Sequence, residues 1–262
     1  SISRCKVMER WRGRVAVVTG ASAGIGAAIT RALVEQGMIV VGLARREALL
    51  QELATELSDS EGKLIPRKCD LSVESDIVEA FEWIEETLKG ADVIINNAGI
   101  MDNTPLLDAP TTIWRQMLDI NILALVICSK LALNSMLSRG VDDGHVININ
   151  SLLGHKVMGN LLPFYSSTKW AVTALCRAFQ NELFVRQSHI RVTSMCPGLT
   201  RTEQADSFKE GKDDAALSPA DVADAVIYAL STPSTVIIEE MKIAPNDGRI
   251  GHSLAPTRTN QI

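Results

Sequence analysis

Short apolar segments alternate along the chain with longer segments in which apolar residues recur every three or four positions. Short, β-branched, almost wholly apolar segments are typical of strands covered on both faces of a sheet, and the longer periodic segments predict amphipathic helices. The predicted strands are 15–19, 39–43, 63–67, 92–96, 145–150, 190–196 and 236–243, and the predicted helices are 24–36, 47–57, 74–88, 111–138, 165–187 and 219–231.

This alternation predicts an α/β fold in which a doubly wound, mostly or wholly parallel seven-stranded sheet is flanked by helices, because parallel strands need crossover helices. Ser72 and Ser218 stand at positions typical of helix N-caps. Neither a long linker nor an internal repeat divides the sequence, so we expect one domain over 1–262. Within it we expect an N-terminal extension (1–13), a short substrate lid (201–217) and a C-terminal tail (245–262).

The composition is that of an ordinary globular chain: 262 residues, 46% hydrophobic and 22% charged. A chain of this length buries enough apolar surface to fold without disulfides or metal. The net charge of −5 argues against a nucleic-acid partner, which usually requires a basic stripe.

We expect no membrane span, which needs about 18 to 20 apolar residues, because the densest apolar stretch, 120–128, is interrupted by Asn121. Residues 1–14 are polar and basic and show no secretion segment.

The cysteines and histidines predict neither disulfides nor a metal site. The five cysteines are odd in number and form no CxxC pair, so we expect reduced thiols and a cytoplasmic protein. The four histidines lack the HExxH spacing of zinc enzymes. These residues are Cys5, Cys69, Cys128, Cys176, Cys196, His145, His155, His189 and His252.

Two predicted helices, 111–138 and 165–187, are apolar on more than the face that would pack on the sheet, so neither has a polar face suited to solvent. One side of each must meet the sheet, and the other predicts contact with further copies of the chain, giving a homodimer or homotetramer. The alternative is that both sides are buried within one chain.

A glycine-rich turn, TGASAGIG at 19–26, follows the first predicted strand and opens the first helix. Gly20 permits a tight turn, Gly24 lets a pyrophosphate approach the backbone, and Gly26 lets helix and strand pack closely. Free amides at the helix N-terminus then face the phosphates. In this position the turn favours a Rossmann-type dinucleotide-binding domain over a turn that serves packing alone. Its other contacting residues are expected to be Ser22, Ala23 and Ile25.

The end of the second strand favours NADP as the cofactor. An NAD-binding protein usually has Asp or Glu there to bind the ribose diol, whereas this chain has Arg45 and Arg46 and no acid before Glu47. A guanidinium suits a 2′-phosphate, and Ser22 is placed to assist it. The alternatives are that both arginines are merely solvated, or that the cofactor is NAD.

Over about 15–243 the sequence resembles the short-chain dehydrogenase/reductase family. The glycine turn matches that family's TGxxxGxG pattern, and further family motifs follow in order. They are Asp70-Leu71 after the third strand, Asn96-Asn97-Ala98-Gly99 after the fourth, Asn121, Ser151, the YxxxK pair Tyr165 and Lys169, and Pro197-Gly198 with Thr202. The resemblance implies an oxidoreductase that transfers a hydride between a nicotinamide cofactor and an alcohol or carbonyl.

In that scheme Tyr165 is the acid/base, and Lys169, one helical turn later, supplies a positive charge that favours the phenolate and also binds the nicotinamide ribose. Ser151 hydrogen-bonds the substrate oxygen, and Asn121 holds a water that relays protons. The resemblance also implies which residues surround the cofactor. For two of them there is an alternative: Asp70 would only fix its turn, and Asn97 would only satisfy backbone groups at a strand end. That set is Asp70, Leu71, Asn97, Ala98, Gly99, Tyr165, Lys169, Pro197, Gly198, Thr200 and Thr202.

The segments 8–14, 141–151 and 221–228 resemble a branch of the family that is NADP-linked and acts on steroids, diketones or terpenoid alcohols such as farnesol. By that likeness Met8 is the native start and 1–7 an extension or cloning remnant. The charged stretch 203–214 is shorter than that branch's substrate-covering loop, which predicts a more open pocket.

We therefore expect a small lipophilic substrate held by Ser151, Leu153, Met158 and Tyr165. Leu152, Val157, Leu161 and Leu162 lie in the same stretch and either line the pocket or pack within the loop. The alternative function is a regulatory protein that binds NADP without significant turnover.

Overall fold

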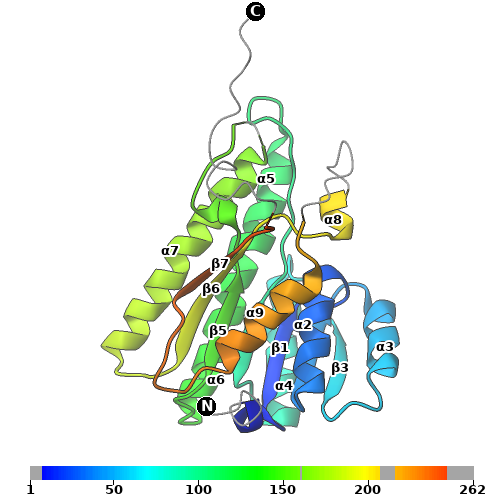
Figure 1. Ribbon diagram of the computed structural model, residues 1–262, viewed down its shortest axis with the longest axis vertical. Helices are drawn as coiled ribbons and strands as arrows, with labels where there is room; N and C mark the ends of the chain where they lie inside the picture. Colours follow the sequence, from blue (N-terminus) through cyan, green and yellow to red (C-terminus); the bar gives the residue numbers. More distant parts are fainter. Residues whose placement is uncertain (1–7, 160, 207–215, 247–262) are drawn as a thin grey trace, which may run out of the picture.

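The computed structural model describes residues 8–159, 161–206 and 216–246 and consists of a central sheet between two layers of helices (Figure 1). The sheet has seven strands in the order β3-β2-β1-β4-β5-β6-β7, and every neighbouring pair is parallel. The predicted number of strands and the predicted parallel arrangement are therefore both confirmed. The strands are β1 (Val15–Thr19), β2 (Ile39–Ala44), β3 (Lys63–Lys68), β4 (Val93–Asn96), β5 (His145–Ile149), β6 (Arg191–Pro197) and β7 (Glu240–Ile243).

The helices cover both faces of the sheet because its strands are apolar on both sides. One apolar cluster joins the sheet to α2, α3 and α9, and the other joins it to α4, α6 and α7. The bounds are α2 (Gly24–Glu35), α3 (Glu47–Glu56), α4 (Glu74–Leu88), α5 (Thr111–Leu118), α6 (Leu125–Ser138), α7 (Pro163–Val185), α8 (Glu203–Asp206) and α9 (Pro219–Leu230), with single turns η1 (Glu9–Trp11) and η3 (Leu152–Gly154) and a π-helical segment η2 (Asp119–Ala124).

Local chemistry explains where some predicted boundaries fail. The predicted strand 236–243 is a strand only from Glu240, because β6 side chains hold the preceding carbonyls: Thr193 Oγ1 donates to Ile238 O at 2.5 Å. Ser218 caps α9 in a reciprocal capping box with Asp221, as predicted. Ser72 does not cap α4; its hydroxyl donates instead to Asp70 Oδ1 at 2.7 Å.

The described part of the predicted N-terminal extension is packed into the core. Met8 and Trp11 are buried in the cluster beneath α2 and α9. The Trp11 indole donates to Leu230 O at 3.0 Å, so this segment ties the chain's start to the end of α9. Residues 1–7 lie outside the described residues.

By length and composition alone, one helical stretch among the described residues, Thr111–Ser138, could cross a membrane, a test that the core helix of a folded protein also passes. Half of its most apolar window is buried inside the chain, where Cys128, Ala132 and Met136 join the core. Its apolar character is thus explained in large part by packing beside α4 and α7.

His145, at the start of β5, makes stability sensitive to mild acid. It is fully buried, and burial, reinforced by the charges of Arg191 and Arg10, holds its pKa well below the usual value. Below about pH 6.5 the unfolded chain gains a proton there that the folded chain does not. We therefore expect the free energy of unfolding to fall by up to about 1.4 kcal/mol per pH unit below that point, measured by urea denaturation between about pH 7 and pH 5.

The variant His145→Gln should flatten this acid dependence, because its side chain does not titrate. His189→Gln, at an exposed histidine paired with Asp142, should leave the dependence in place. An acid dependence unchanged in His145→Gln would assign the effect to other groups.

Candidate active site

A cleft of ≈ 1730 Å³ lies at the carboxyl ends of the strands. The strand order reverses between β1 and β4, and parallel α/β sheets bind ligands where their order reverses. A pocket for one small ligand usually measures roughly 300–1,000 Å³, so this cleft has room for a dinucleotide and a substrate together.

The glycine turn forms one wall of the cleft. Gly20 and Gly24 have φ of +67° and +53°, which other residues rarely adopt. Ala23, the N-cap of α2, offers no side-chain oxygen to the first-turn amides, and no acidic residue occupies that turn. Ser22, Ala23, Gly24 and Ile25 all line the cleft, as predicted, so the residues present suit a phosphate.

Gly26 does not line the cleft and lies behind it. A Cβ at this position would stand 2.2 Å from Gly20 O and 2.5 Å from Asn97 Nδ2. The third glycine therefore permits close packing between α2 and the turn, the role that the sequence predicts for it.

Asn97 supports the turn from the end of β4. Its side-chain amide donates to Thr19 O at 2.9 Å, and its backbone amide donates to Thr19 Oγ1 at 3.0 Å. Asn97 lines the cleft with Ala98 and Gly99, but its amide nitrogen is used in holding β1 and β4 together. Of the two roles considered for Asn97, the structure shows the supporting one directly.

At the far end of the cleft, Arg45 follows β2 and is exposed to solvent. Arg46 is also exposed, and it pairs with Glu203 of α8 at 3.1 Å. Asp70 accepts hydrogen bonds from Ser72, and these bonds lower its pKa more than the charge of nearby Arg45 does. Asp70 thus fixes the turn after β3 while also lining the cleft.

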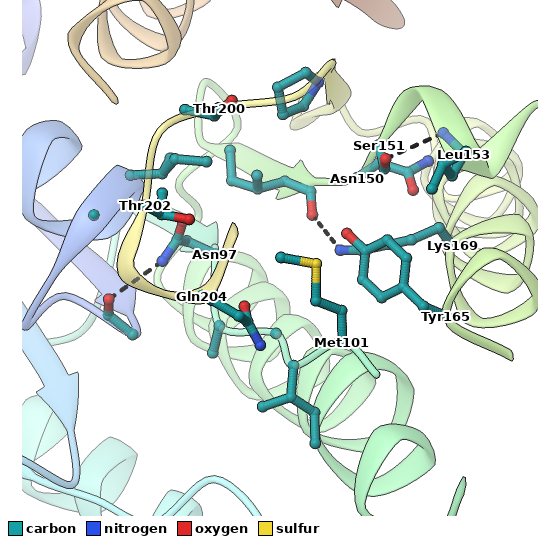
Figure 2. A pocket seen from close by; sticks show the side chains of 18 of the residues that line it. Asn97, Met101, Asn150, Ser151, Leu153, Tyr165, Lys169, Thr200, Thr202 and Gln204 are labelled. Atoms are coloured by element: carbon teal, nitrogen blue, oxygen red, sulfur yellow. Dashed lines mark hydrogen bonds between the residues drawn. The ribbon is translucent and has the colours of Figure 1, made fainter. Parts of the chain in front are cut away.

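Tyr165, Ser151 and Lys169 meet at the other end of the cleft (Figure 2). Ser151 follows β5, and its hydroxyl lies near enough to the Tyr165 phenol to lower the pKa of that phenol. Lys169 lies one turn along α7 from Tyr165, with its Nζ 5.5 Å from the centre of the tyrosine ring and donating to Ile149 O at 2.8 Å. Residues that are distant in sequence are thus brought to one point by the ends of β5 and α7.

The ionisation of this group differs from the expectation. Burial raises the pKa of Tyr165 to about 12, against the lowering effect of Ser151. Burial also lowers the pKa of Lys169 to about 8. The sequence predicts that the lysine charge lowers the pKa of the phenol, but the two causes that shift this pKa are burial, which raises it, and Ser151, which lowers it.

Asn121 lies behind this group and does not line the cleft. It is 1% exposed, and its side chain both donates to Ile100 O and accepts from Ile100 N, each at 2.8 Å. Its Nδ2 also donates to Thr168 Oγ1 on α7 at 3.0 Å. The long predicted helix 111–138 changes to π-helical geometry over Asp119–Ala124, around Asn121. Such wide turns occur often at functional sites.

The remaining predicted residues line the cleft as well. Leu153 is buried, and Met158 is 38% exposed in the wall between Ser151 and Tyr165. Sequence reasoning missed Met101 and Leu199, which reach the cleft from loops whose paths no local pattern defines. The other predicted residues found in the lining are Leu71, Leu152, Val157, Leu161, Leu162, Pro197, Gly198, Thr200 and Thr202.

Comparisons with known proteins show the family of the chain. The family model described as short chain dehydrogenase matches residues 14–213. Dehydrogenase/reductase SDR family member 11 of Homo sapiens is 46% identical over 252 residues, covering 92% of this chain and 97% of the human protein. Farnesol dehydrogenase of Aedes aegypti is 46% identical over 245 residues, covering 91% and 98%.

A solved structure gives the same result for the fold. The alcohol dehydrogenase of Thermococcus sibiricus, complexed with 5-hydroxy-NADP, superposes with a TM-score of 0.81 at 29% identity, covering 90% of this chain and 97% of the other. The family model matches residues 14–213 of the 262, and the two relatives and the solved structure each cover 90% or more of the chain. The chain therefore belongs to the short-chain dehydrogenase family.

Proposed function

We propose that the protein is an NADP(H)-dependent oxidoreductase that interconverts a lipophilic alcohol and its carbonyl, with Tyr165 as the acid/base. The observation that carries the proposal is the meeting of Tyr165, Ser151 and Lys169 at one end of a cleft whose other end carries Arg45. A proton donor, a hydrogen-bonding hydroxyl and a buried cation lie together where a carbonyl can reach them.

The cleft residues suit NADP. The glycine turn and the uncapped first turn of α2 would hold the pyrophosphate, and Arg45 would hold the 2′-phosphate. When bound, the reduced cofactor supplies the hydride for the carbonyl carbon. The Thermococcus sibiricus relative is complexed with an NADP derivative, which supports the same cofactor here.

In carbonyl reduction Tyr165 would give its phenol proton to the substrate oxygen, which Ser151 holds by a hydrogen bond. A raised pKa keeps the phenol protonated, which is the form that reduction requires. Lys169, held by Ile149 O, would bind the nicotinamide ribose and stabilise the phenolate left behind. Asn121 would position the Ile100 loop and α7 around the pair.

An apolar wall supports a lipophilic substrate such as a steroid, a diketone or a terpenoid alcohol. Leu153 and Met158 line the same cleft as Ser151 and Tyr165, and Leu199 lines it from the loop after β6. The mosquito relative is named farnesol dehydrogenase, in agreement with this class. Most of the predicted lid, 201–217, lies outside the described residues, and its α8 part contacts Arg46.

Exposed apolar side chains on the long helices support a homodimer or homotetramer formed through those helices. The free cysteines support a cytoplasmic protein with reduced thiols. Phe184 is 83% exposed and Trp170 is 48% exposed on α7, and Leu123 is 51% exposed on η2. Cys69, Cys128, Cys176 and Cys196 are free in the described structure. Light scattering of the purified chain tests the oligomer, and a monomer would refute it.

A paired assay with NADPH and NADH tests cofactor and substrate together. With diketones, steroid ketones and aldehydes, and with farnesol in the reverse direction, we expect turnover with NADPH and little with NADH. Replacing Arg45 with Ala should lower the preference for NADPH about 10- to 100-fold, because one charge-assisted contact to the 2′-phosphate is lost. Kinetic constants with both cofactors measure the change.

Arg186→Ala is the matched control, because Arg186 pairs with Glu182 on α7 and does not line the cleft. An unchanged preference in Arg45→Ala would contradict the 2′-phosphate assignment. Tight NADPH binding without turnover on any substrate would instead indicate the regulatory function considered from the sequence.

A further inference from the structure

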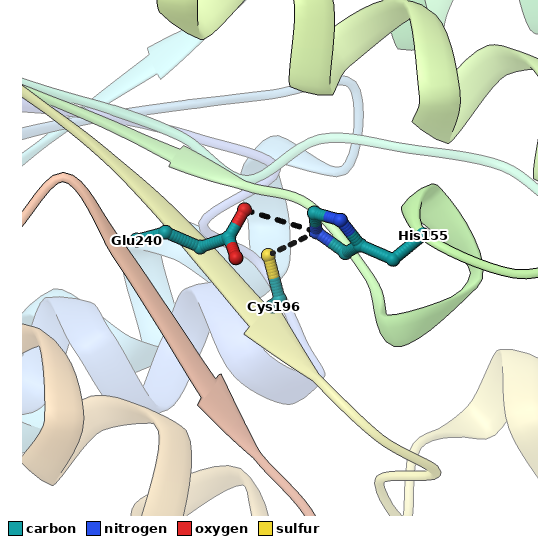
Figure 3. A group of neighbouring side chains, drawn as sticks. All are labelled: His155, Cys196 and Glu240. Atoms are coloured by element: carbon teal, nitrogen blue, oxygen red, sulfur yellow. Dashed lines mark hydrogen bonds and ion pairs between the residues drawn. The ribbon is translucent and has the colours of Figure 1, made fainter. Parts of the chain in front are cut away.

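A second group of reactive side chains lies outside the catalytic group. His155, Cys196 and Glu240 come from the segment after η3, from β6 and from β7 (Figure 3). His155 Nε2 lies 3.4 Å from Cys196 Sγ and 3.1 Å from Glu240 Oε2. The three ligand atoms all lie within 4.8 Å of one another.

The sheet register explains this meeting. Glu240 pairs with Ser194 across β6 and β7, and Cys196 lies two residues farther along β6. Since residues two apart in a strand face the same side, Cys196 and Glu240 project from one face of the sheet. His155 reaches that face from the loop, and its ring also approaches Trp170 of α7.

The two separations measured from His155 Nε2 are close to the ligand spacing of a zinc site. With Zn–S of about 2.3 Å and Zn–N or Zn–O of about 2.0–2.2 Å, tetrahedral ligand atoms lie about 3.3–3.6 Å apart. The observed separations of 3.4 Å and 3.1 Å require only small shifts to meet these values. One thiol and one imidazole favour zinc over magnesium or calcium, which prefer oxygen ligands alone.

We propose that His155, Cys196 and Glu240 bind one zinc ion, with water as the fourth ligand. Sequence motifs did not indicate it because the three residues are far apart along the chain and form no metal-ligand spacing.

The surrounding groups suit such a site. Lys242 pairs with Glu240 Oε1 at 2.9 Å, which leaves Oε2, the oxygen that faces His155, for the metal. The Ser194 hydroxyl lies 3.3 Å from Cys196 Sγ. Outer partners of this kind orient metal ligands. Cys196 is buried, whereas the side chains of His155 and Glu240 are 21% and 29% exposed, which gives an ion a path of entry.

Binding would replace the thiol proton of Cys196 with a sulfur–zinc bond and release that proton to solvent, with no change in oxidation state. A thiol must lose its proton to bind zinc, so zinc affinity should rise with pH.

A bound ion would join the substrate wall to the sheet. His155 directly follows η3, which carries Leu153, and Cys196 directly precedes the cofactor-lining pair Pro197 and Gly198. Zinc binding should therefore raise the melting temperature of the protein, because only the folded chain brings the three ligands together.

The test uses the full chain, freed of metal with EDTA and then freed of EDTA. Titration with zinc chloride in a calorimeter should give one ion per chain, and cobalt(II) should give the charge-transfer absorption of a cobalt–thiolate bond. Cys196→Ser should abolish that absorption. Cys196→Ser, His155→Ala and Glu240→Gln should each weaken zinc binding at least about tenfold, since even outer-partner changes cost about that much.

Matched controls are Cys69→Ser and His189→Ala, which remove a thiol or an imidazole elsewhere and should retain zinc binding. Circular dichroism checks that each variant is folded. The proposal is overturned if the wild-type chain binds no zinc, if the cobalt complex lacks thiolate absorption, or if the three ligand variants bind zinc as tightly as the wild type. None of these results bears on the proposed oxidoreductase activity.

Discussion

Replacing Tyr165 with Phe is expected to reduce kcat for carbonyl reduction about 10²- to 10⁴-fold, the usual contribution of a positioned proton donor. Phe keeps the ring beside Lys169 but removes the phenol hydroxyl, whose pKa the neighbouring Ser151 lowers. The substrate oxygen then has no protein group to give it a proton as hydride arrives. Steady-state kinetics with NADPH measures the loss.

NADPH affinity should be nearly unchanged in this variant, because the glycine turn and Arg45 stand at the other end of the cleft. The chain has one other tyrosine, Tyr228, which lies on α9 and does not line the cleft. Tyr228→Phe is therefore the matched control and should retain full turnover. Full turnover in Tyr165→Phe would refute the role proposed for its phenol.

Replacing Gly26 with Ala is expected to destabilise the fold by about 1–3 kcal/mol, in the range found for overpacked interiors. The new methyl group would lie 2.2 Å from Gly20 O, a backbone atom with little freedom to move. Separating α2 from the turn would also misplace the amides at the phosphate position, so NADPH binding should be lost. Urea denaturation and fluorescence titration with NADPH measure the two effects.

Gly99→Ala is the stability control, because the nearest atom to its added methyl group is Asn121 Oδ1 at 3.5 Å, an ordinary contact. Its free energy of unfolding should stay close to that of the wild type. If Gly26→Ala retains both the wild-type stability and NADPH affinity, the close packing seen at this turn is not needed.

Much of the fold was predictable because it is encoded locally. Segments such as 15–19 and 145–149 are apolar on both faces, which a residue pattern shows directly, and the structure places both as strands in a parallel sheet. Ser218 and Pro219 marked the start of α9 by their own chemistry. The prediction failed at 236–239, where side chains of β6 hydrogen-bond two of the carbonyls: Arg191 that of Val236 and Thr193 that of Ile238.

The candidate site was predictable for a related reason. In a parallel sheet every strand delivers its following residues to the same edge, so residues that end successive strands must gather there. Gly20, Arg45, Asn97 and Ser151 therefore share one cleft, and Lys169 follows Tyr165 by one helical turn.

The sequence by itself determined the doubly wound sheet, the glycine turn and the order of the site residues, because strand pattern, turn chemistry and helical spacing act between near neighbours. The tertiary structure alone decided that Asn121 holds the Ile100 loop, that burial raises the pKa of Tyr165, and that His155 meets Cys196 and Glu240. Each of these depends on contacts between segments far apart in the chain and on the water that those contacts exclude. A local pattern of residues predicts neither the contacts nor the exclusion of water.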